Sequence, residues 1–343
     1  MAFWLDIADF ALKALIIVVA IVAAMGGLAV IIARLTRSAE PKDQEIKVRS
    51  LNERYDDMRD SMNAALLDKK ERKGLLKARK KALKALRGKP PGKRIYVMAF
   101  KGDMRATAVK QLGQKIDAVL TVARPGTDEV VLRLESPGGT VTGYGLAAAE
   151  ILRLREHKVK VTASVDQVAA SGGYMMAAAA DRIVAAPFAI VGSIGVVAPI
   201  PNLHRLLKKN EIDFEEMTAG EWKRSISVLG EITPAGREHF RGKLEDTYGA
   251  FKAHVARCRP NVDIAQVANG DTWLASEAVA LGLVDEIATG DEWLFKARDG
   301  ARLYEVSTEA RKNLLQQLLS GLGVAAQRAA DFAAARLVRS PGL

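Results

Sequence analysis

The pattern of hydrophobic and polar positions along the chain changes near residues 34 and 94. The first zone contains an uninterrupted apolar run, ALIIVVAIVAAMGGLAVIIA, at residues 14–33. Twenty helical residues at about 1.5 Å each cover about 30 Å, the thickness of the hydrocarbon core of a bilayer. The run therefore predicts a transmembrane helix, preceded by a short segment at residues 1–13. A cleaved signal peptide is the alternative, but the run is longer than a signal's apolar core and the preceding segment is not basic.

Residues 34–94 are highly charged, carry a narrow apolar stripe, and predict a basic helical stalk or linker. Within this zone, residues 44–88 fit one long helix, or two helices broken near Gly74. The apolar positions that recur at steps of three and four are Leu51, Tyr55, Met58, Met62 and Ala65. Such a stalk either pairs with neighbouring chains or lies on anionic lipid, and the alternative is a solvated linker. The sequence Lys89-Pro90-Pro91-Gly92 ends the segment.

From residue 95 onward, short apolar runs alternate with longer amphipathic segments. Strands are predicted at 95–100, 129–135, 160–165, 181–186 and 214–219. Helices are predicted at 103–123, 141–156 and 234–257, and a short buried helix is predicted to start near Gly172. This alternation is typical of an α/β fold in which helices cover a mostly parallel sheet. We place the α/β domain at residues 95–300 and an Ala- and Leu-rich helical tail at 301–343.

The net charge of +11 is concentrated in one segment. Residues 34–94 hold 20 Lys and Arg against nine Asp and Glu, whereas the rest of the chain is close to neutral. A nearly neutral α/β domain gives no reason to expect nucleic-acid binding. Cys258 is the only cysteine, which excludes an internal disulfide and a cysteine-based metal cluster.

One serine stands where a strand is expected to give way to a helix, in QVAASGGYMMAAAA at residues 167–180. A helix that begins at about Gly172 directs its first N–H groups and its positive end toward Ser171, which favours an alkoxide or oxyanion there. Gly172 and Gly173 also leave room for a substrate. The alternative is an ordinary helix N-cap, because serine is common at that position.

A glycine turn, Ser136-Pro137-Gly138-Gly139, follows the strand predicted at 129–135. The N–H groups of Gly138 or Gly139 can face a developing oxyanion, so this turn and Ser171 together make up half of an acyl-transfer site. A plain strand-to-helix turn is the alternative.

The group that accepts the proton is harder to place. The histidines, none of which lies beside a glycine turn, are His157, His204, His239 and His254, so a Ser-His-Asp triad lacks a base. Lys223 stands in GEWKRSISVLG, among apolar neighbours. Enclosure by apolar groups lowers the pKa of a lysine and leaves a neutral amine that can act as a base. The alternative for Lys223 is a solvated surface lysine.

A further serine, Ser193, lies between two glycines in VGSIGVVAP at residues 191–199. Its hydroxyl is placed to hold the lysine amine toward Ser171. A turn serine that satisfies local backbone groups is the alternative.

Five motifs, taken together, resemble one known family. In order they are LRLESPGG, VAASGGYMMA, APFAIVGSIGVV, TAGEWKRSISVLGE and, near residues 282–286, GLVDE. Their order and spacing are similar to those of the signal peptide peptidase A family of membrane serine peptidases. Within that family the chain is most similar to the branch that combines one anchor, a basic stalk and a single catalytic domain. The similarity covers roughly residues 1–300.

The resemblance implies a fold, a set of roles and a set of partners. The fold would be the ClpP/crotonase-like spiral of ββα units. Ser171 would be the nucleophile, Lys223 the general base and Ser193 the hydroxyl that orients it. The oxyanion hole would be lined by N–H groups of Gly138 or Gly139 and of Gly172. The reaction would be the hydrolysis of a polypeptide without metal or cofactor, in a homo-oligomer whose lysine comes from the same or a neighbouring subunit.

The family also implies a single-pass protein of the bacterial inner membrane with a periplasmic catalytic domain. A count of basic residues opposes this side, because Arg34, Arg37, Lys42, Lys47 and Arg49 follow the apolar run. Export of a long domain regardless of flanking charge would reconcile the two. Two rival functions stay open: an acyl-CoA hydratase or isomerase of the same superfamily, and an inactive membrane scaffold.

Overall fold

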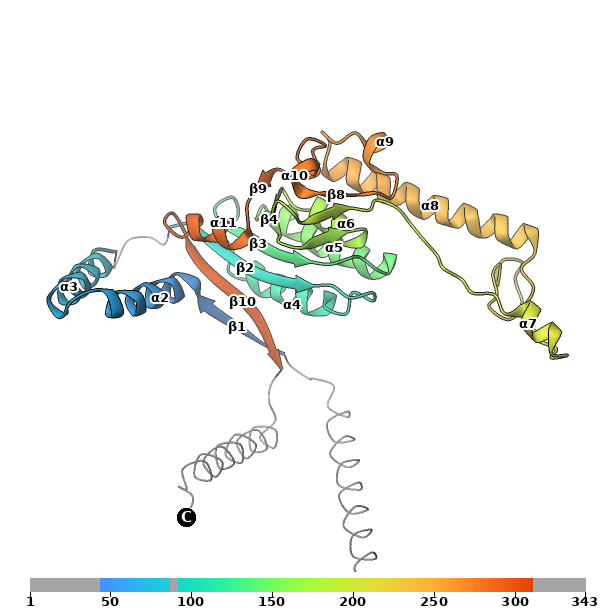
Figure 1. The fold of residues 1–343 in the computed structure, drawn as a ribbon, viewed down its shortest axis with the longest axis horizontal. Coiled ribbons are helices and arrows are strands. Elements are labelled where there is room, and N and C mark those ends of the chain that lie inside the picture. The colour runs from blue at the N-terminus through green and yellow to red at the C-terminus, as the bar shows by residue number, and fades with distance from the viewer. Residues whose placement is uncertain (1–43, 87–91, 311–343) are drawn as a thin grey trace, which may run out of the picture. The chain divides into compact units, whose positions relative to one another are not determined.

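The computed structural model describes residues 44–86 and 92–310 of the 343-residue chain (Figure 1). The predicted transmembrane helix at 14–33 and the tail beyond residue 310 lie outside the described residues. Among the described helices, none is both long enough and apolar enough to cross a membrane. In chain order the elements are β1 (Gln44–Ser50), α2 (Leu51–Leu66), α3 (Lys69–Leu86), β2 (Arg94–Lys101), α4 (Val109–Leu120), β3 (Glu129–Glu135), α5 (Val141–Glu156), β4 (Lys160–Val165), β5 (Val168–Ala170), α6 (Gly172–Ala178), β6 (Arg182–Ala185), β7 (Ile190–Gly192), α7 (His204–Lys209), α8 (Pro234–Cys258), α9 (Ile264–Val267), β8 (Thr272–Leu274), α10 (Ala275–Ala278), β9 (Glu286–Ile287), α11 (Gly290–Ala297) and β10 (Arg302–Ala310).

A seven-stranded sheet lies at the centre of the compact unit Ile46–Thr308, with its strands in the order β1-β10-β2-β3-β4-β6-β9. Every neighbouring pair from β10 to β9 is parallel. β2 pairs with β3 over seven residues, from Ile95 opposite Glu129 to Lys101 opposite Glu135. The expected α/β fold with a mostly parallel sheet is confirmed.

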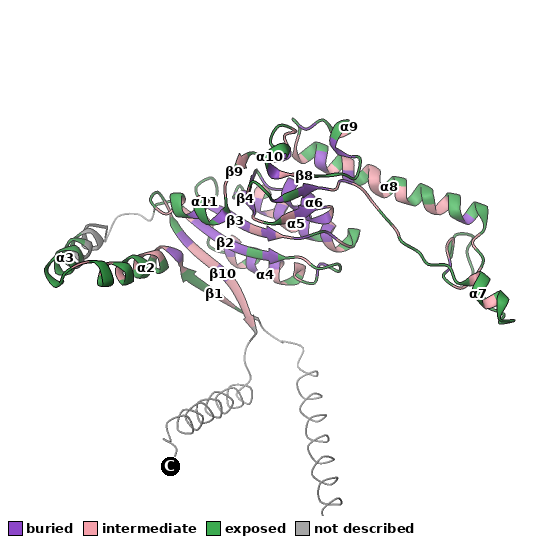
Figure 2. Cartoon of the chain, viewed as in Figure 1, coloured by how far each residue is buried: buried purple, intermediate pink, exposed green. Residues whose placement is uncertain are grey.

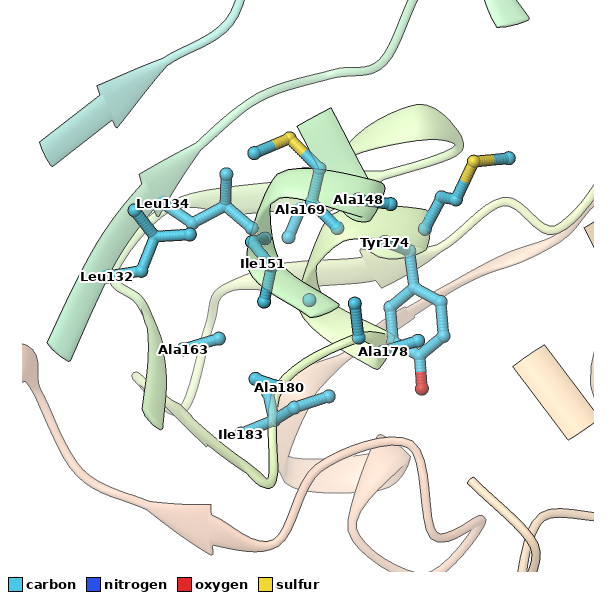
Figure 3. Close-up of a cluster of buried hydrophobic side chains, with 14 of the residues drawn as sticks. Leu132, Leu134, Ala148, Ile151, Ala163, Ala169, Tyr174, Ala178, Ala180 and Ile183 are labelled. Atoms are coloured by element: carbon cyan, nitrogen blue, oxygen red, sulfur yellow. The ribbon is translucent and has the colours of Figure 1, made fainter. Parts of the chain in front are cut away.

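The central strands are buried because they are short, nearly continuous apolar runs covered on both faces. β2, β3 and β4 are buried along most of their length, as the purple strands in Figure 2 show. Figure 3 shows Leu132 and Leu134 of β3 against Ile151 of α5, with Tyr174 of α6 nearby. The alanines at 177–180 are fully buried, and their small side chains let α6 pack closely against its neighbours.

Three successive segments of the chain have the same arrangement of strands in the large sheet and in a second, smaller sheet. β5 pairs with β7 in parallel and β7 with β8 in antiparallel orientation, and Ser136 bridges to Ala169 of β5. β3 with Ser136, β4 with β5, and β6 with β7 therefore each add one strand to the large sheet and one extended stretch to the small sheet. A helix follows each of these units, α5 and α6 directly and α8 after the long insertion 193–233.

Secondary structure differs from the sequence prediction at both ends of the compact unit. Residues 44–50 form strand β1 instead of the start of a helix, and the helices that follow break at Leu67–Asp68 instead of at Gly74. Helix α3 starts after this break because the Asp68 carboxylate accepts the N–H groups of Lys70 and Glu71, as an N-cap residue does. Residues 302–310, predicted as part of the helical tail, form β10, which lies between β1 and β2.

The insertion between β7 and α8 is the other departure. Residues 214–219 were predicted as a strand but pair with no strand in the described chain, and α7 precedes them. Figure 1 shows this insertion extending away from the large sheet along α8. It carries large exposed apolar side chains, including Val197, Leu206, Ile212, Met217 and Trp222. Many exposed apolar side chains on one insertion are typical of a protein–protein contact surface.

Candidate active site

Ser171 lies between strand β5 and helix α6, at a sharp strand-to-helix turn. Its backbone has φ 51° and ψ −120°, outside the regions that residues with a side chain normally adopt. Strain of this kind persists only where surrounding contacts impose it, and it concentrates at active sites. The Ser171 side chain makes no capping hydrogen bond to the helix, so the N-cap interpretation does not account for it.

The contacts that impose this conformation come from strand β7. Ala170 of β5 stands in register with Gly192 of β7, and the Ser171 N–H donates to the Gly192 carbonyl at 2.8 Å. Ser193 is the next residue after Gly192 and also has a positive φ, of 53°. Its N–H donates to the carbonyl of Asp271 at 2.6 Å. The structure thus brings Ser171 and Ser193 to the same end of the small sheet.

The glycine turn 136–139 packs directly on Ser171. The Ser136 N–H donates to the carbonyl of Val168, and the Ala170 N–H donates to the carbonyl of Ser136, which ties the turn to β5. A Cβ on Gly138 would lie 2.7 Å from the Cβ of Ser171 and 2.8 Å from the nitrogen of Gly172. With φ +93° as well, position 138 accepts only glycine.

The three glycines predicted for an oxyanion hole differ in how their N–H groups are used. The Gly138 N–H donates to the Ser136 hydroxyl oxygen at 3.1 Å. Within the described residues, the N–H groups of Gly139 and Gly172 donate to no protein acceptor. For Gly172 this is expected, because the first N–H groups of a helix have no partner within that helix. Two unpaired donors near Ser171 are the arrangement that binds an oxyanion.

A cavity of about 930 Å³ opens at this point. Its lining includes Gly139, Ser171, Gly172 and Ser193, together with α5, α6 and α8. The apolar part of the wall includes Ala148, Leu152, Met175, Tyr248 and Phe251. The cavity is large enough for several side chains of an extended peptide and offers them mainly apolar surface.

His254, which the sequence did not connect with Ser171, lines the same cavity. Its Nε2 lies 2.9 Å from the carbonyl oxygen of Met175, a contact that requires a proton on Nε2, and Nδ1 lies 3.4 Å from the Arg257 guanidinium. Burial opposes the cationic form, but the contacts with Cys258 and with the Met175 carbonyl together outweigh it and raise the pKa of His254. Because both ring nitrogens are engaged, His254 does not present a free lone pair to Ser171.

Lys223 is not among the residues that line this cavity in the described chain. It lies in the insertion before α8, and its side chain is exposed, so this single chain does not provide the apolar enclosure that the sequence predicted. The loop around it is nonetheless well braced. Trp222 stacks on the ring of His239 at 4.2 Å, and Glu216 pairs with Arg224 at 2.7 Å and accepts from Ser227 at 3.0 Å.

The chemistry of the site is that of hydroxyl groups and backbone N–H groups. In the part of the chain that the structure describes, no three His, Cys, Asp or Glu side chains gather as metal ligands would. The groups that face the cavity at Ser171 are suited to attack on a carbonyl and to stabilisation of the resulting oxyanion.

Comparisons with known proteins point to one family. A sequence model described as Peptidase family S49 N-terminal matches residues 2–151, and one described as Peptidase family S49 matches residues 153–304. "Probable protease SohB" of Haemophilus influenzae is 49% identical over 223 residues, 65% of this chain and 63% of that protein. "Putative protease SohB" of Buchnera aphidicola subsp. Baizongia pistaciae is 38% identical over 307 residues, 84% of this chain and 86% of that protein.

Solved structures resemble the chain more distantly. A mutant of the 1510-N membrane-bound stomatin-specific protease matches 60% of this chain and 85% of its own, with 16% identity and a TM-score of 0.41. The match to the Haemophilus protein spans slightly less than two thirds of that relative's length.

Proposed function

Because this chain belongs to peptidase family S49, we propose that it is a serine endopeptidase that hydrolyses polypeptides with Ser171 as the nucleophile. The observation that carries the proposal is the strained backbone of Ser171, which is held against Gly138 and beside two unpaired N–H groups at the mouth of a cavity. A serine with only a structural role has no need of this conformation.

The proposed mechanism uses Lys223 as the general base. As a neutral amine, Lys223 takes the proton of Ser171 while the Ser171 oxygen attacks the peptide carbonyl. The N–H groups of Gly139 and Gly172 stabilise the oxyanion, and the ammonium then protonates the leaving amine. Water repeats the sequence on the acyl-enzyme, and the Ser193 hydroxyl orients the amine in both steps.

Lys223 reaches Ser171 from a neighbouring subunit in this proposal. In the single chain Lys223 is exposed on a braced loop, and exposed apolar side chains surround it along the insertion 193–233. Docking of this insertion on a second copy would bury those side chains and supply the apolar enclosure that lowers the pKa of a lysine. A head-to-tail contact of this type produces a closed homo-oligomeric ring when the rotation between neighbouring subunits closes.

The fold and the cavity fit this reaction. The repeated unit that adds one strand to each of two sheets, followed by a helix, supports the ClpP/crotonase-like spiral. The apolar cavity wall favours substrates with apolar side chains, bound extended along the small sheet. Signal peptides and other membrane-associated polypeptides have this composition, and they are the proposed substrate class.

We place the protein in the bacterial inner membrane through the single apolar run at 14–33, with the catalytic domain in the periplasm. The basic helix α3 is proposed to contact anionic lipid. Lys69, Lys73, Lys77 and Lys81 recur at every fourth position of α3 and are all exposed. No carboxylate pairs with these four side chains in the described residues.

The proposal is tested with the purified full-length protein in detergent. A fluorophosphonate probe should label the wild type and spare Ser171→Ala, and peptide hydrolysis measured against pH should be lost in Lys223→Met. Lys209→Met, which changes another exposed lysine of the same insertion, is the matched control and should keep its rate. An unlabelled wild type, or equal rates for wild type and Lys223→Met, would reject the proposed mechanism. Labelling also separates it from an acyl-CoA enzyme or an inactive scaffold.

A further inference from the structure

A continuous chain of hydrogen bonds runs beneath the glycine turn. The Gly138 N–H donates to the Ser136 hydroxyl oxygen at 3.1 Å, and the two hydroxyls of Ser136 and Tyr144 lie 2.6 Å apart. The Tyr144 hydroxyl donates to the carbonyl of Asp103 at 2.9 Å. Ser136 and Tyr144 are both fully buried.

The direction of each bond follows from the number of protons. A tyrosine hydroxyl has one proton, and that of Tyr144 goes to Asp103 because a carbonyl can only accept. The Ser136 proton must therefore go to the Tyr144 oxygen, which leaves the Ser136 oxygen to accept from Gly138. Burial, the largest cause, raises the pKa of Tyr144, so the tyrosine keeps its proton at neutral pH. Bonds that all point one way strengthen one another.

The chain of hydrogen bonds ends at Asp103, which is itself held in place. The Asp103 carboxylate accepts the Thr107 hydroxyl at 2.6 Å and the Thr107 N–H at 2.9 Å, which folds the loop after β2. The next carbonyl, that of Met104, accepts the Thr140 N–H at 2.8 Å. A Cβ on Gly139 would lie 2.2 Å from that same carbonyl oxygen. The loop after β2 thus contacts the glycine turn and the residue after it at two points, Gly139 and Thr140.

Tyr144 also touches the element that carries the nucleophile. A Cβ on Gly172 would lie 2.4 Å from the Tyr144 ring, and a Cβ on Gly102 would lie 2.3 Å from its hydroxyl oxygen. One buried side chain therefore contacts the first residue of α6 with its ring and the glycine turn, through Ser136, with its hydroxyl. Both sides of the oxyanion site depend on its position.

We propose that Ser136 and Tyr144 are positioning residues that select the oxyanion donors. They hold the Gly138 N–H inward on the Ser136 oxygen, and the next N–H in the turn, that of Gly139, is left to face the cavity together with that of Gly172. The inference rests on the proposed function. It chooses Gly139 over Gly138, a choice that the sequence left open.

A structural role alone would make different predictions. If the chain of hydroxyls only stabilises the fold, its loss should lower the melting temperature and leave the kcat of the folded enzyme unchanged. If it positions the Gly139 donor, its loss should lower kcat while KM stays constant, because an oxyanion exists only in the transition state.

The experiment compares Tyr144→Phe and Ser136→Ala with Tyr174→Phe in the full-length enzyme. Tyr174 is an equally buried tyrosine, and its hydroxyl donates to the Leu283 carbonyl at 3.0 Å, so it controls for the loss of a buried hydroxyl. We expect kcat to fall about tenfold or more in Tyr144→Phe and in Ser136→Ala, with KM within about twofold of wild type. Tyr174→Phe should keep the wild-type kcat.

The double variant Ser136→Ala/Tyr144→Phe adds an internal check. Because both hydroxyls act through one chain of hydrogen bonds, the kcat of the double variant should be only slightly lower than that of the worse single variant. Unchanged kcat in folded Tyr144→Phe and Ser136→Ala would overturn the inference while leaving Ser171 as the nucleophile. A wild type that the fluorophosphonate probe does not label would reject the proposed function itself, so the two failures are distinguishable.

Discussion

Ser171 and Ser193 each follow one member of a register pair, Ala170 and Gly192, at the same end of two parallel strands. They also share an unusual backbone conformation, with φ of 51° and 53°. The Ser171 N–H donates to the carbonyl of Gly192, so the two serines are held by one hydrogen-bonded pair of strands. A shift of β7 against β5 would change the distance between Ser171, the proposed nucleophile, and Ser193, the proposed orienting hydroxyl, so the pairing of the small sheet sets the geometry of the proposed site.

Gly138→Ala should lower the rate of peptide hydrolysis about a hundredfold. The new Cβ would meet the Cβ of Ser171 at 2.7 Å, and the backbone there has φ +93°. Either the turn or the serine must move, and a displacement of about 1 Å at an oxyanion site lowers kcat about a hundredfold. Gly126→Ala is the control for positive φ alone, because position 126 has φ +72° and nothing within 4 Å. Peptide hydrolysis by both folded variants checks this, and equal rates would contradict it.

Subunit mixing should restore activity if Lys223 acts across an interface. Ser171→Ala and Lys223→Met should each be inactive alone, but a mixed ring would contain some contacts between an intact serine and an intact lysine. Random assembly at equal amounts makes about a quarter of the sites complete in a head-to-tail ring. Activity is measured after the two variants are dissociated and reassembled together.

The matched control is the double variant Ser171→Ala/Lys223→Met mixed with either single variant. That mixture contains no intact pair of serine and lysine in any arrangement and should stay inactive. Mixed single variants that also stay inactive, although they form hetero-oligomers, would show that serine and lysine must come from one chain.

The elements that build the site were predictable because each depends on local pattern. Strand 129–135, helix 141–156 and strand 160–165 match β3, α5 and β4 residue for residue. Ser171 was recognisable from its position before two glycines and an alanine run. Its backbone strain was not, because the strain is imposed by β7, which lies about twenty residues away in the chain.

Features that depend on contacts between distant parts of the chain could not be predicted from the sequence. Residues 302–310 were included in the Ala- and Leu-rich helical tail, but they pair with β2 and lie beside β1, and these distant partners make them strand β10. The positioning role of Tyr144 depends on contacts with Asp103, 41 residues earlier in the chain. The enclosure of Lys223 was inferred from neighbours in sequence, yet those neighbours are mostly exposed or half-buried in the single chain.

Asp128→Asn should lower stability at neutral pH without affecting the site chemistry. Its side chain is fully buried and pairs with Arg94 and Arg124, both at 2.6 Å. Burial alone would raise the pKa of Asp128, but hydrogen bonds from the two arginines outweigh it and hold the pKa well below the usual range. Loss of one partner in a buried ion pair costs about 3 kcal/mol.

The sign of the pH dependence follows from this depressed pKa. The stabilisation is fully present above the unfolded-state value of about 4 and is lost as pH falls through the folded-state value. Thermal unfolding should therefore separate wild type from Asp128→Asn by several degrees at pH 7, and the difference should shrink as the pH falls below about 4. Asp117→Asn removes a largely exposed carboxylate that pairs with Arg153 and should change stability by less than about 1 kcal/mol. A constant difference at all pH values would contradict the argument.

Alkaline phosphatase fused after Ala310 should be active in cells if the catalytic domain is periplasmic. Fusion at this point retains β10, which belongs to the large sheet. Deletion of residues 1–33 removes the proposed anchor and should leave the reporter inactive in the cytoplasm. A fluorescent protein that matures only in the cytoplasm serves as the reciprocal reporter. Fluorescence with an inactive phosphatase would place the domain on the cytoplasmic side.

Changing Lys69, Lys73, Lys77 and Lys81 to Gln should weaken binding to anionic vesicles. Like charges four residues apart destabilise a helix, so an uncompensated row of lysines is unfavourable unless an anionic surface lies against it. Each lysine near such a surface contributes about 1 kcal/mol, and Gln preserves helix propensity. Flotation of a fragment covering residues 44–310 with phosphatidylglycerol vesicles should fall at least about tenfold.

The control changes four other exposed lysines, Lys101, Lys110, Lys160 and Lys296, to Gln and alters net charge equally. Vesicles of phosphatidylcholine alone should bind neither variant nor the wild type, and binding to anionic vesicles should weaken as salt is raised. If both sets of substitutions reduced binding equally, net charge rather than α3 would be responsible. The lipid proposal requires binding that depends on the anionic headgroup. If the wild-type fragment bound RNA but not vesicles, the proposal would be wrong and the lysine row would belong to a nucleic-acid surface.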